Sequence, residues 1–231
     1  MKILITGSSG FIGGELVKNL KDKHELVTFD SVDGQNLLDY DHLKEAMSGC
    51  DVVIHLAAIP APVEGKNFSD YFKINCQGTF NVAQACLENH VKKLIFTSST
   101  TYYGVERGIP FMKPIKENNL VVTQYVKVDD LECRDCDIAY STSKVIAEQI
   151  LANYGLTKKF QVVILRIGPT RPSGVHRPFL GTHLKIENAI QAIERAINVK
   201  NKLWYEAFTI TDDLEDIDIS KAKEILAYDP E

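Results

Sequence analysis

The sequence predicts an α/β fold in which a parallel sheet is covered by helices on both faces. Three observations predict it. Short apolar runs alternate with segments of helical apolar spacing through residues 1–167. A glycine-rich turn, T-G-S-S-G-F-I-G at residues 6–13, joins the first apolar run to the first helical segment. The sequence Y-S-T-S-K at residues 140–144 sets a phenol and an ammonium one helical turn apart.

The alternation gives the expected elements in order. It predicts strands at residues 2–6, 25–30, 51–56, 92–98 and 160–167, and helices at residues 11–22, 40–48, 69–89 and 138–154. Strands that alternate with helices are typical of a Rossmann-type, doubly wound parallel sheet, so residues 1–167 are expected to form a dinucleotide-binding domain. Residues 168–231 are expected to add a small C-terminal substrate lobe, not an independent domain, with a helix near 186–198, a strand near 203–210 and a helix near 219–226.

The glycine turn has the context that a dinucleotide-binding motif requires, because a strand precedes it and a helix follows it. Gly7 permits the tight turn, Gly10 lets backbone amides approach a pyrophosphate, and Gly13 lets the helix pack closely on the strand. Phe11 and Ile12 open the helix, whose free N–H groups and positive dipole end would face the anion. The spacing is G-x-x-G-x-x-G rather than G-x-G-x-x-G.

The second predicted strand ends at Asp30, an acidic residue about 20 positions after the glycines, where the adenosine ribose is held in such folds. No arginine follows it, since the next residues are Ser31, Val32 and Asp33. A 2′-phosphate would meet carboxylates there. The predicted cofactor is therefore NAD rather than NADP, and residues 1–167 are predicted to form an NAD-binding Rossmann domain.

The order of these motifs resembles the extended short-chain dehydrogenase/reductase superfamily, in its NAD-dependent epimerase/dehydratase branch. Five segments carry the resemblance: residues 6–13, D-V-V-I-H-L-A-A at 51–58, N-C-Q-G-T at 75–79, F-T-S-S-T-T-Y-Y-G at 96–104, and residues 140–144. Residues 165–166 and 218–230 are also similar to the family pattern. The resemblance implies an NAD-dependent enzyme that transfers a hydride at a sugar carbinol, with a nucleotide-sugar epimerase as its commonest form.

The resemblance also assigns the catalytic residues. Tyr140 is the expected base for the hydroxyl proton. A free tyrosine has a pKa of about 10 and is a poor base at neutral pH, but a neighbouring ammonium, here that of Lys144, favours the phenolate. Lys144 is also implied to hold the nicotinamide ribose. Ser99 and Thr100 are the expected contacts to the substrate oxygen, and Asn75 is similar to the asparagine that steadies the active-site water and lysine.

Further cofactor contacts are expected at Leu56, Ala57 and Ala58, the small and apolar residues beneath the cofactor in the family. Where the family often has an aspartate for the adenine amino group, this chain has N-L-L-D at residues 36–39. Asn36 offers an amide oxygen there, with Leu37 beside it. Asn36 could equally be a turn residue.

Arginines in the loop at residues 168–181 are candidates for binding an anionic group of the substrate. Arginine presents a planar fork of donors that matches a carboxylate or a phosphate. Arg177 ranks first, because it is similar to the substrate arginine of uronate dehydrogenases, and Arg171 second, with His176 a loop residue. The alternative is that both arginines are solvated at the surface. The excursion at residues 105–137 is a lid over the site or an inert insertion.

Composition narrows the class of protein. The 231 residues carry a net charge of -5 with no basic stripe, which argues against nucleic acid as a partner. No apolar run reaches the roughly 18–20 residues that span a membrane, and no secretory signal is recognised, so a cytoplasmic location is expected. Five cysteines suit a reducing compartment. Cys133 and Cys136 form a lone C-x-x-C without the second pair that zinc requires, so no metal is predicted.

Three functions stay open at this point. The first is an NAD-dependent epimerase/dehydratase-type enzyme acting on a sugar or nucleotide-sugar. The second is a dehydrogenase of a free sugar acid, similar to uronate dehydrogenases. The third is a dinucleotide-binding regulator without turnover, against which the set of Ser99, Tyr140 and Lys144 argues. A homodimer through the helices at 69–89 and 138–154 is implied by the family.

Overall fold

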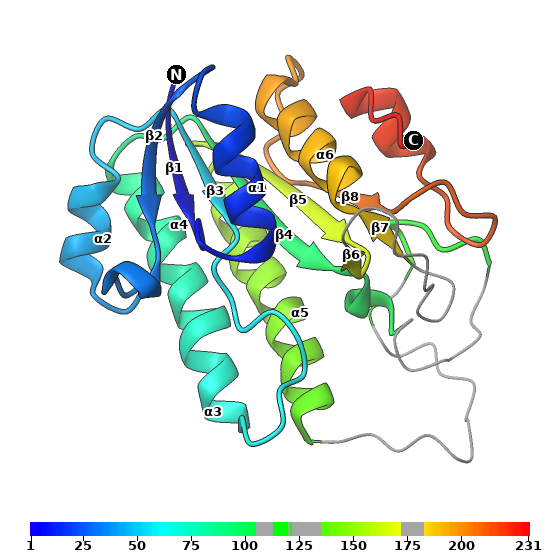
Figure 1. Cartoon of the computed structure of the whole chain (residues 1–231), viewed down its shortest axis with the longest axis horizontal. Helices are drawn as coiled ribbons and strands as arrows, with labels where there is room; N and C mark the ends of the chain where they lie inside the picture. Colours follow the sequence, from blue (N-terminus) through cyan, green and yellow to red (C-terminus); the bar gives the residue numbers. More distant parts are fainter. Residues whose placement is uncertain (105–112, 120, 122–134, 172–182) are drawn as a thin grey trace.

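A computed structural model of the chain describes residues 1–104, 113–119, 121, 135–171 and 183–231. Its centre is a six-stranded sheet in which every neighbouring pair of strands is parallel (Figure 1). In spatial order the strands are β2 (Glu25–Phe29), β1 (Lys2–Thr6), β3 (Val52–His55), β4 (Lys93–Ser99), β5 (Gln161–Ile167) and β8 (Glu206–Ile210). The predicted fold class is confirmed.

The strands form where the sequence has short runs of β-branched and apolar residues. β3 and β4 are buried along their whole length, as expected for central strands covered on both faces. β2 lies at the edge of the sheet and is partly exposed, which fits its more polar sequence. Most strand and helix bounds agree with those expected from the sequence to within one or two residues.

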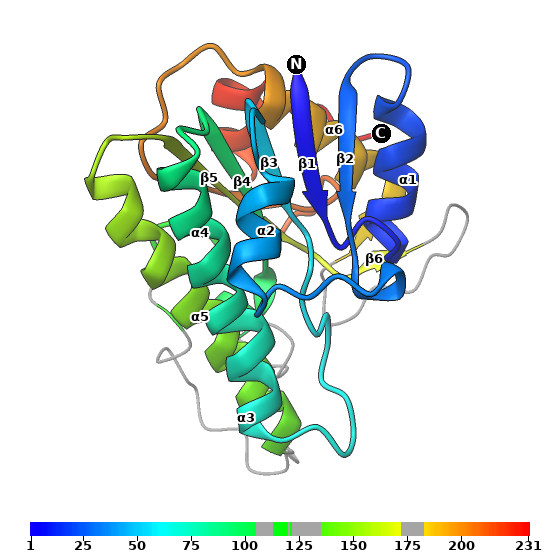
Figure 2. The same ribbon diagram turned by 90° about the vertical axis from the view of Figure 1, so that its left-hand side faces the viewer.

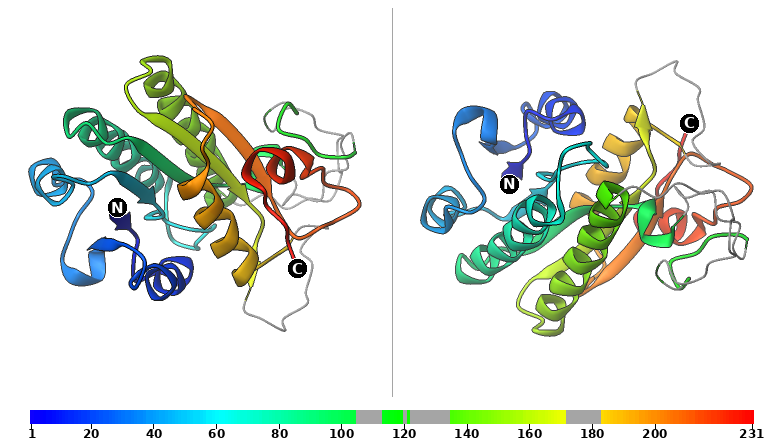
Figure 3. Two further views of the ribbon diagram at one scale, coloured as in Figure 1. Left: turned by 90° about the horizontal axis from the view of Figure 1, so that it is seen from above. Right: turned by 90° about the horizontal axis from the view of Figure 1, so that it is seen from below.

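Helices cover the two faces of the sheet (Figures 2 and 3). One face carries α1 (Phe11–Leu20) and α6 (Ile186–Asn198), which contact each other and bury a core that includes Leu16, Leu20 and Ile193. The other face carries α2 (Tyr40–Ala46), α4 (Gly78–Glu88) and α5 (Asp135–Leu156) over a second core. Burial of these apolar side chains holds the three layers together.

The helix expected at 69–89 runs without a break, but its type changes along its length. It begins as α3 (Phe68–Tyr71), where Asn67 and Asp70 form a capping box, and it continues as α4. Between them Phe72–Gln77 is a π-helical turn, and Asn75 lies within it. Such widened turns are often found at functional sites.

Two elements that we expected in the C-terminal lobe belong to the main layers. β8 pairs with β5 as the sixth strand of the sheet, and α6 packs over β4 and β5. Strand pairing joins residues far apart in the chain, so a periodic pattern alone could not place them. The division of the chain at residue 167 is therefore not a boundary between layers.

Smaller elements complete the described part of the C-terminal region. β6 (Thr170–Arg171) and β7 (Leu184–Lys185) form a two-stranded parallel sheet, and Ala222–Leu226 is a second π-helical turn, near the helix expected at 219–226. Of the excursion at 105–137, the described residues 113–119 lie against the C-terminal segment, where Ile115 and Ile217 form a β-bridge.

The strand order indicates where on the sheet a ligand is expected to bind. From β1 the chain passes to β2 on one side, and β3 returns to the other side of β1. In open parallel sheets ligands bind beyond the carboxyl ends of the strands at this reversal. In the part of the chain that the structure describes, no helix has the length and apolar character needed to cross a membrane.

Candidate active site

A cavity of about 1280 Å³ opens at the carboxyl ends of the strands. Pockets for a single drug-sized ligand usually measure about 300–1,000 Å³, so this one has room for a cofactor and a second molecule. Its walls come from the glycine turn, the end of β2 and the segment that follows, residues 56–62, the end of β4, α5, and residues 167–170.

The glycine turn has no space for a Cβ atom at two of its positions. Gly7 has a φ of 72°, and a Cβ there would lie 2.6 Å from the backbone nitrogen of Ala57. A Cβ on Gly13 would lie 2.1 Å from the carbonyl oxygen of Gly7. The start of α1 therefore packs directly on the turn, and Gly10, the N-cap, has no side chain to bond the first helical N–H groups. These groups are suited to bind an anion.

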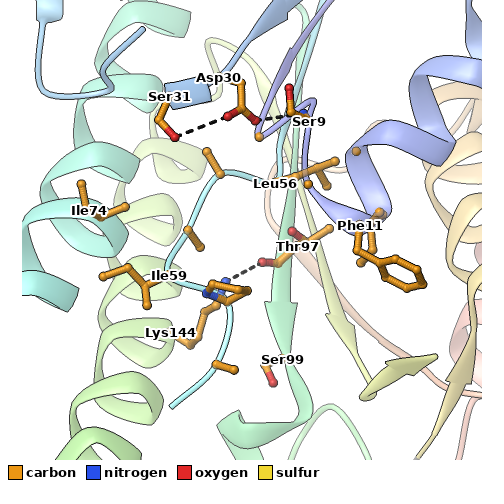
Figure 4. Close-up of a pocket in the computed structure, with 18 of the residues that line it drawn as sticks. Ser9, Phe11, Asp30, Ser31, Leu56, Ile59, Ile74, Thr97, Ser99 and Lys144 are labelled. Atoms are coloured by element: carbon orange, nitrogen blue, oxygen red, sulfur yellow. Dashed lines mark hydrogen bonds between the residues drawn. The ribbon is translucent and has the colours of Figure 1, made fainter. Parts of the chain in front are cut away.

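Asp30 links the end of β2 to the glycine turn (Figure 4). Its Oδ2 accepts a hydrogen bond from the N–H of Ser9 at 2.9 Å, and its Oδ1 accepts from the N–H of Val32 at 3.0 Å. The carboxylate is buried at the wall of the cavity. It lies where the sequence predicted the contact to a ribose, and two backbone N–H groups hold its oxygens in place.

The other predicted cofactor contacts line the same part of the cavity: Phe11, Ile12, Asn36, Leu37, Leu56, Ala57 and Ala58. Asn36 also acts as a turn residue, the alternative stated above, because its Oδ1 accepts from the N–H of Leu38 at 2.9 Å. Leu37 is buried and packs close to Gly78 of α4.

Three of the four predicted catalytic residues, Ser99, Tyr140 and Lys144, line the same cavity, and Figure 4 shows Ser99 and Lys144 apart from Asp30. All three side chains are buried. Lys144 donates from Nζ to the carbonyl oxygen of Thr97 at 3.1 Å, which holds the ammonium beside the end of β4 (Figure 4). Tyr140 packs edge-on against Tyr71, with ring centroids 6.2 Å apart.

Thr101, not Thr100, lines the cavity beside Ser99. After Ser99 the chain enters a 3₁₀ turn, Thr100–Tyr103, and the Ser99 side chain accepts from the N–H of Thr101. The two hydroxyl groups also bond each other. Thr100 is fully buried, so the structure does not bring this predicted substrate contact to the cavity.

Asn75 is not among the residues that line the cavity; it holds the wall in place. Its Oδ1 accepts from the N–H of Ile59 at 2.8 Å, while its Nδ2 donates to the carbonyl of Ile59 at 3.2 Å and to Oγ of Ser143 at 2.9 Å. Tyr71 supports the same segment, since its hydroxyl donates to Ala61 O and accepts from Val63 N. The Asn75 side chain thus binds the backbone of Ile59 and the side chain of Ser143, contacts that the resemblance did not imply.

A buried chain of hydrogen bonds runs behind the cavity through His55. The hydroxyl of Thr79 donates to the carbonyl of Asn75 at 2.6 Å, so it accepts from Nε2–H of His55 at 3.0 Å. Nδ1 of His55 then accepts from the hydroxyl of Thr6 at 2.7 Å, which itself accepts from Ala57 N. Burial, with a smaller contribution from Lys144, lowers the pKa of His55 to about 3, so the ring is neutral.

Several predictions lie outside what the structure describes. His176, Arg177 and Cys133 are in the ranges that are not described, and Arg171 is described only as backbone. Cys136 is buried beside Tyr71 and Tyr140. Among the described residues, no three His, Cys, Asp or Glu side chains are grouped so as to hold a metal.

Sequence reasoning missed part of the cavity wall. Residues 59–62 and 167–170, Ile74, Thr101 and Asp137 all line it. Asp137 could have been found, because it lies one helical turn before Tyr140. The loop residues carry no comparable signal.

Two proteins of similar sequence are named as an epimerase and a dehydrogenase. The chain is 28% identical over 223 residues to an uncharacterized UDP-glucose epimerase of Bacillus subtilis, with 83% of this chain and 63% of that protein covered. It is 29% identical over 174 residues to an L-arabinose 1-dehydrogenase (NAD(P)(+)) of Haloferax volcanii, with 72% and 66% covered. The chain thus spans less than two thirds of the length of either relative.

Among solved structures, the fold is similar to that of a UDP-glucuronic acid 4-epimerase from Bacillus cereus in complex with NAD. The TM-score is 0.78 at 21% identity, and the match covers 100% of this chain and 92% of that one. At this identity the likeness shows the fold alone.

The family is shown by the sequence itself. Residues 3–207 match the model of the NAD dependent epimerase/dehydratase family, a range that includes every motif from the glycine turn to the lysine of α5. This match confirms the predicted family. The chain belongs to the NAD dependent epimerase/dehydratase family.

Proposed function

We propose that this protein transfers a hydride between NAD and a carbinol of a sugar, as a nucleotide-sugar epimerase does. One observation carries the proposal. The glycine turn, Asp30, Ser99, Tyr140 and Lys144 all line one cavity, and in Figure 4 Asp30 lies apart from Lys144 and Ser99. A dinucleotide that extends along this cavity would bring its far end to the hydroxyl, phenol and ammonium groups.

The residues present fit the cofactor. The packing of α1 on Gly7 leaves uncapped N–H groups at the helix start, which suit a pyrophosphate, and Asp30 suits a ribose diol. The Asp30 carboxylate would repel a 2′-phosphate, so we propose a preference for NAD over NADP. When bound, NAD supplies the nicotinamide that accepts and returns the hydride.

The protein side of the reaction is a proton transfer. Tyr140 would take the carbinol proton at its phenolic oxygen, and the Lys144 ammonium would stabilise the phenolate and hold the cofactor ribose. Ser99, with Thr101 bonded to it, would orient the reacting oxygen. Asn75 would act indirectly, because it holds the wall at Ile59 and contacts α5 through Ser143.

A thermal-shift panel tests the proposal. NAD alone should raise the Tm, and NAD together with UDP-glucose or UDP-glucuronic acid should raise it further, since ligands that bind the folded state stabilise it by mass action. dTDP-sugars and free uronates complete the panel. Sugar-nucleotides that give no shift beyond that of NAD, while a free sugar does, would contradict the nucleotide-sugar assignment.

A second candidate is oxidation of a free sugar or sugar acid, as proposed from the resemblance to uronate dehydrogenases. The similarity to an arabinose dehydrogenase favours it. The two reactions differ in product: a dehydrogenase accumulates free NADH, whereas an epimerase returns the hydride and accumulates none. A regulator without turnover would need only the dinucleotide end of the cavity.

We also propose a homodimer through α4 and α5 and a cytoplasmic location. Phe80 on α4 and Ile138 on α5 are exposed, as is Phe68 on α3, which leads into α4. Light scattering after size exclusion measures the mass directly, and a monomer at micromolar concentration would refute the dimer.

A further inference from the structure

A buried ion pair lies next to the catalytic end of the cavity but outside its lining. The carboxylate of Glu148, on α5, is fully buried, and the guanidinium of Arg166, on β5, is 4% exposed. Nη2 of Arg166 lies 2.7 Å from Oε2 of Glu148, and Nε lies 3.0 Å from Oε1, so the pair is bidentate. Such geometry is directional as well as strong.

Glu148 is on the helix face that carries the catalytic groups. It follows Tyr140 by eight residues and Lys144 by four, so the three side chains lie in one row along α5. Lys144 bonds the carbonyl of Thr97, and one turn later Glu148 accepts from the hydroxyl of Ser98. Two successive turns of α5 are therefore tied to two successive residues of β4, directly before Ser99.

Arg166 closes the junction from the neighbouring strand. In the register of β4 and β5 it lies opposite Ser98. Its Nη1 donates to the hydroxyl of Tyr103 at 3.0 Å and to the carbonyl of Glu117 at 3.1 Å, and its guanidinium lies 3.4 Å from the ring centre of Tyr102. The pair thus fixes the helix, both strands and the turn that follows Ser99.

Apolar packing alone would fix α5 poorly. Several of its buried side chains near the site are small, namely Ala139, Ser141, Ser143 and Ala147. Small side chains keep a helix close to a sheet but resist its rotation less than large interlocking ones. A bidentate ion pair can supply the missing specificity of orientation.

We propose that Glu148 is a positioning residue which, through Ser98 and Arg166, sets the rotation of α5 and so directs Tyr140 and Lys144 toward Ser99. The inference rests on the proposed function, because it takes Tyr140 and Lys144 as the working groups. It goes beyond that function in assigning a role to a residue outside the cavity.

The test separates orientation from stability. Glu148→Gln should lower both the Tm and kcat, since it leaves a buried guanidinium without its counter-charge. The double variant Glu148→Leu with Arg166→Met removes both charges and restores packing. It should regain most of the Tm, yet its kcat on the sugar identified by the panel should stay at least tenfold below wild type, with the KM for that sugar within about twofold. The primary deuterium isotope effect on kcat should rise.

Lys93→Met is the matched control. Lys93 is a buried charge at the opposite end of β4, where it donates to the carbonyls of Ala196 and Ile197 at 2.8 Å each. Its replacement should lower the Tm without changing kcat below the transition. A double variant that regains both Tm and kcat would overturn the proposal, because the pair would then serve stability alone.

A second readout does not depend on a substrate. NADH fluoresces, and its emission when bound reports the surroundings of the nicotinamide, which Lys144 would help to hold. The double variant should change the emission maximum or intensity of bound NADH, and Lys93→Met should not. If wild type turns over no sugar, the proposed function fails, and the emission alone decides: unchanged emission in the double variant refutes the positioning role.

Discussion

At the scale of single residues, the cavity is defined by a few groups whose chemistry can be tested one at a time. Tyr140 is buried against Tyr71 and lines the cavity beside Lys144 and Ser99. The phenolic oxygen is the atom on which the proposed reaction depends, and the ring itself serves packing. A substitution that removes only the oxygen separates its role in the reaction from the packing of the ring.

Tyr140→Phe should keep NAD affinity and lose turnover. The ring still packs, but the proton acceptor is gone, and positioned acid–base groups contribute about 10²–10⁴-fold. The measurements are NAD titration by calorimetry and initial rates on the sugar identified by the panel. A variant that keeps more than about a tenth of wild-type activity would show that Tyr140 is not the base.

Neighbouring glycines of α1 should respond in opposite directions. Gly13→Ala would place a methyl group 2.1 Å from the carbonyl oxygen of Gly7, so it should cost about 3 kcal/mol of stability or more and abolish NAD binding. Gly14→Ala has open space around its Cβ and should gain roughly 0.5–1 kcal/mol from helix propensity. Urea unfolding measures both. A Gly13→Ala variant as stable as wild type, with its NAD affinity intact, would mean that the close packing at Gly13 does not matter.

Asp30 should set the choice of cofactor. Asp30→Ala should shift the ratio of NADP to NAD affinity by at least about tenfold, or ~1.4 kcal/mol, because it removes a carboxylate that would face the 2′-phosphate. Asp30→Asn is the matched variant, since it removes the charge at nearly the same size, while its single amide oxygen can accept from only one of the Ser9 and Val32 N–H groups. Wild-type protein that binds NADP more tightly than NAD would refute this assignment.

At the scale of elements, sequence patterns identified what is local and missed what depends on pairing. The bounds of β1 and α1 follow from an apolar run, a glycine turn and a helical period, all within 20 residues of each other. The place of β8 beside β5 depends on contacts between distant parts of the chain, so its pattern predicted a strand but not its sheet.

The candidate site shows the same limit. Ser99, Tyr140 and Lys144 were identified from motifs and meet in one cavity. Whether Thr100 or Thr101 lines the cavity depends on the 3₁₀ turn after Ser99. Successive side chains point in different directions in such a turn than in a strand, so the sequence motif alone did not identify Thr101. Asn75 lies in the π-helical turn, and no residue type in the sequence predicts such a turn, so the contacts of its side chain could not be predicted.

The loop at residues 168–181 is the element for which we predict the substrate's anion contact. Arg177→Ala should raise the KM for the substrate at least tenfold and leave NAD affinity unchanged, because a bidentate charge-assisted contact would be lost. Arg171→Ala is the companion variant, ranked second. Unchanged kinetics in both would mean that neither arginine binds the substrate.

At the scale of the whole molecule, the buried His55 makes stability depend on pH. The folded protein keeps His55 neutral down to about pH 3, because burial lowers its pKa to about 3, whereas the unfolded chain takes up a proton near pH 6.5. The unfolded state therefore binds more protons across this interval. The stability that His55 contributes is present above pH 6.5 and is lost as the pH falls, by about 1.4 kcal/mol per unit.

Urea unfolding at several pH values between 7.5 and 5 checks this. Wild-type stability should fall more steeply than that of His55→Gln, which cannot take up the proton. His42→Gln, at an exposed position on α2, serves as control and should keep the wild-type slope. Parallel slopes in wild type and His55→Gln would show that another group accounts for the pH dependence.

The π-helical turn Phe72–Gln77 has a consequence for how this chain aligns with its relatives. Each residue of an α-helix advances the chain by about 100° around the helix axis. The deletion of one residue from an α-helix therefore rotates every later side chain onto another face. A π-helical turn already holds about one residue more than an α-helical turn. Removing one residue from Phe72–Gln77 would restore α-helical geometry and leave α3 and α4 facing as they do now. A relative that lacks one residue here can therefore keep the same packing of this helix. When a relative is one residue shorter in this region, the alignment gap belongs at Phe72–Gln77 and not in a neighbouring loop.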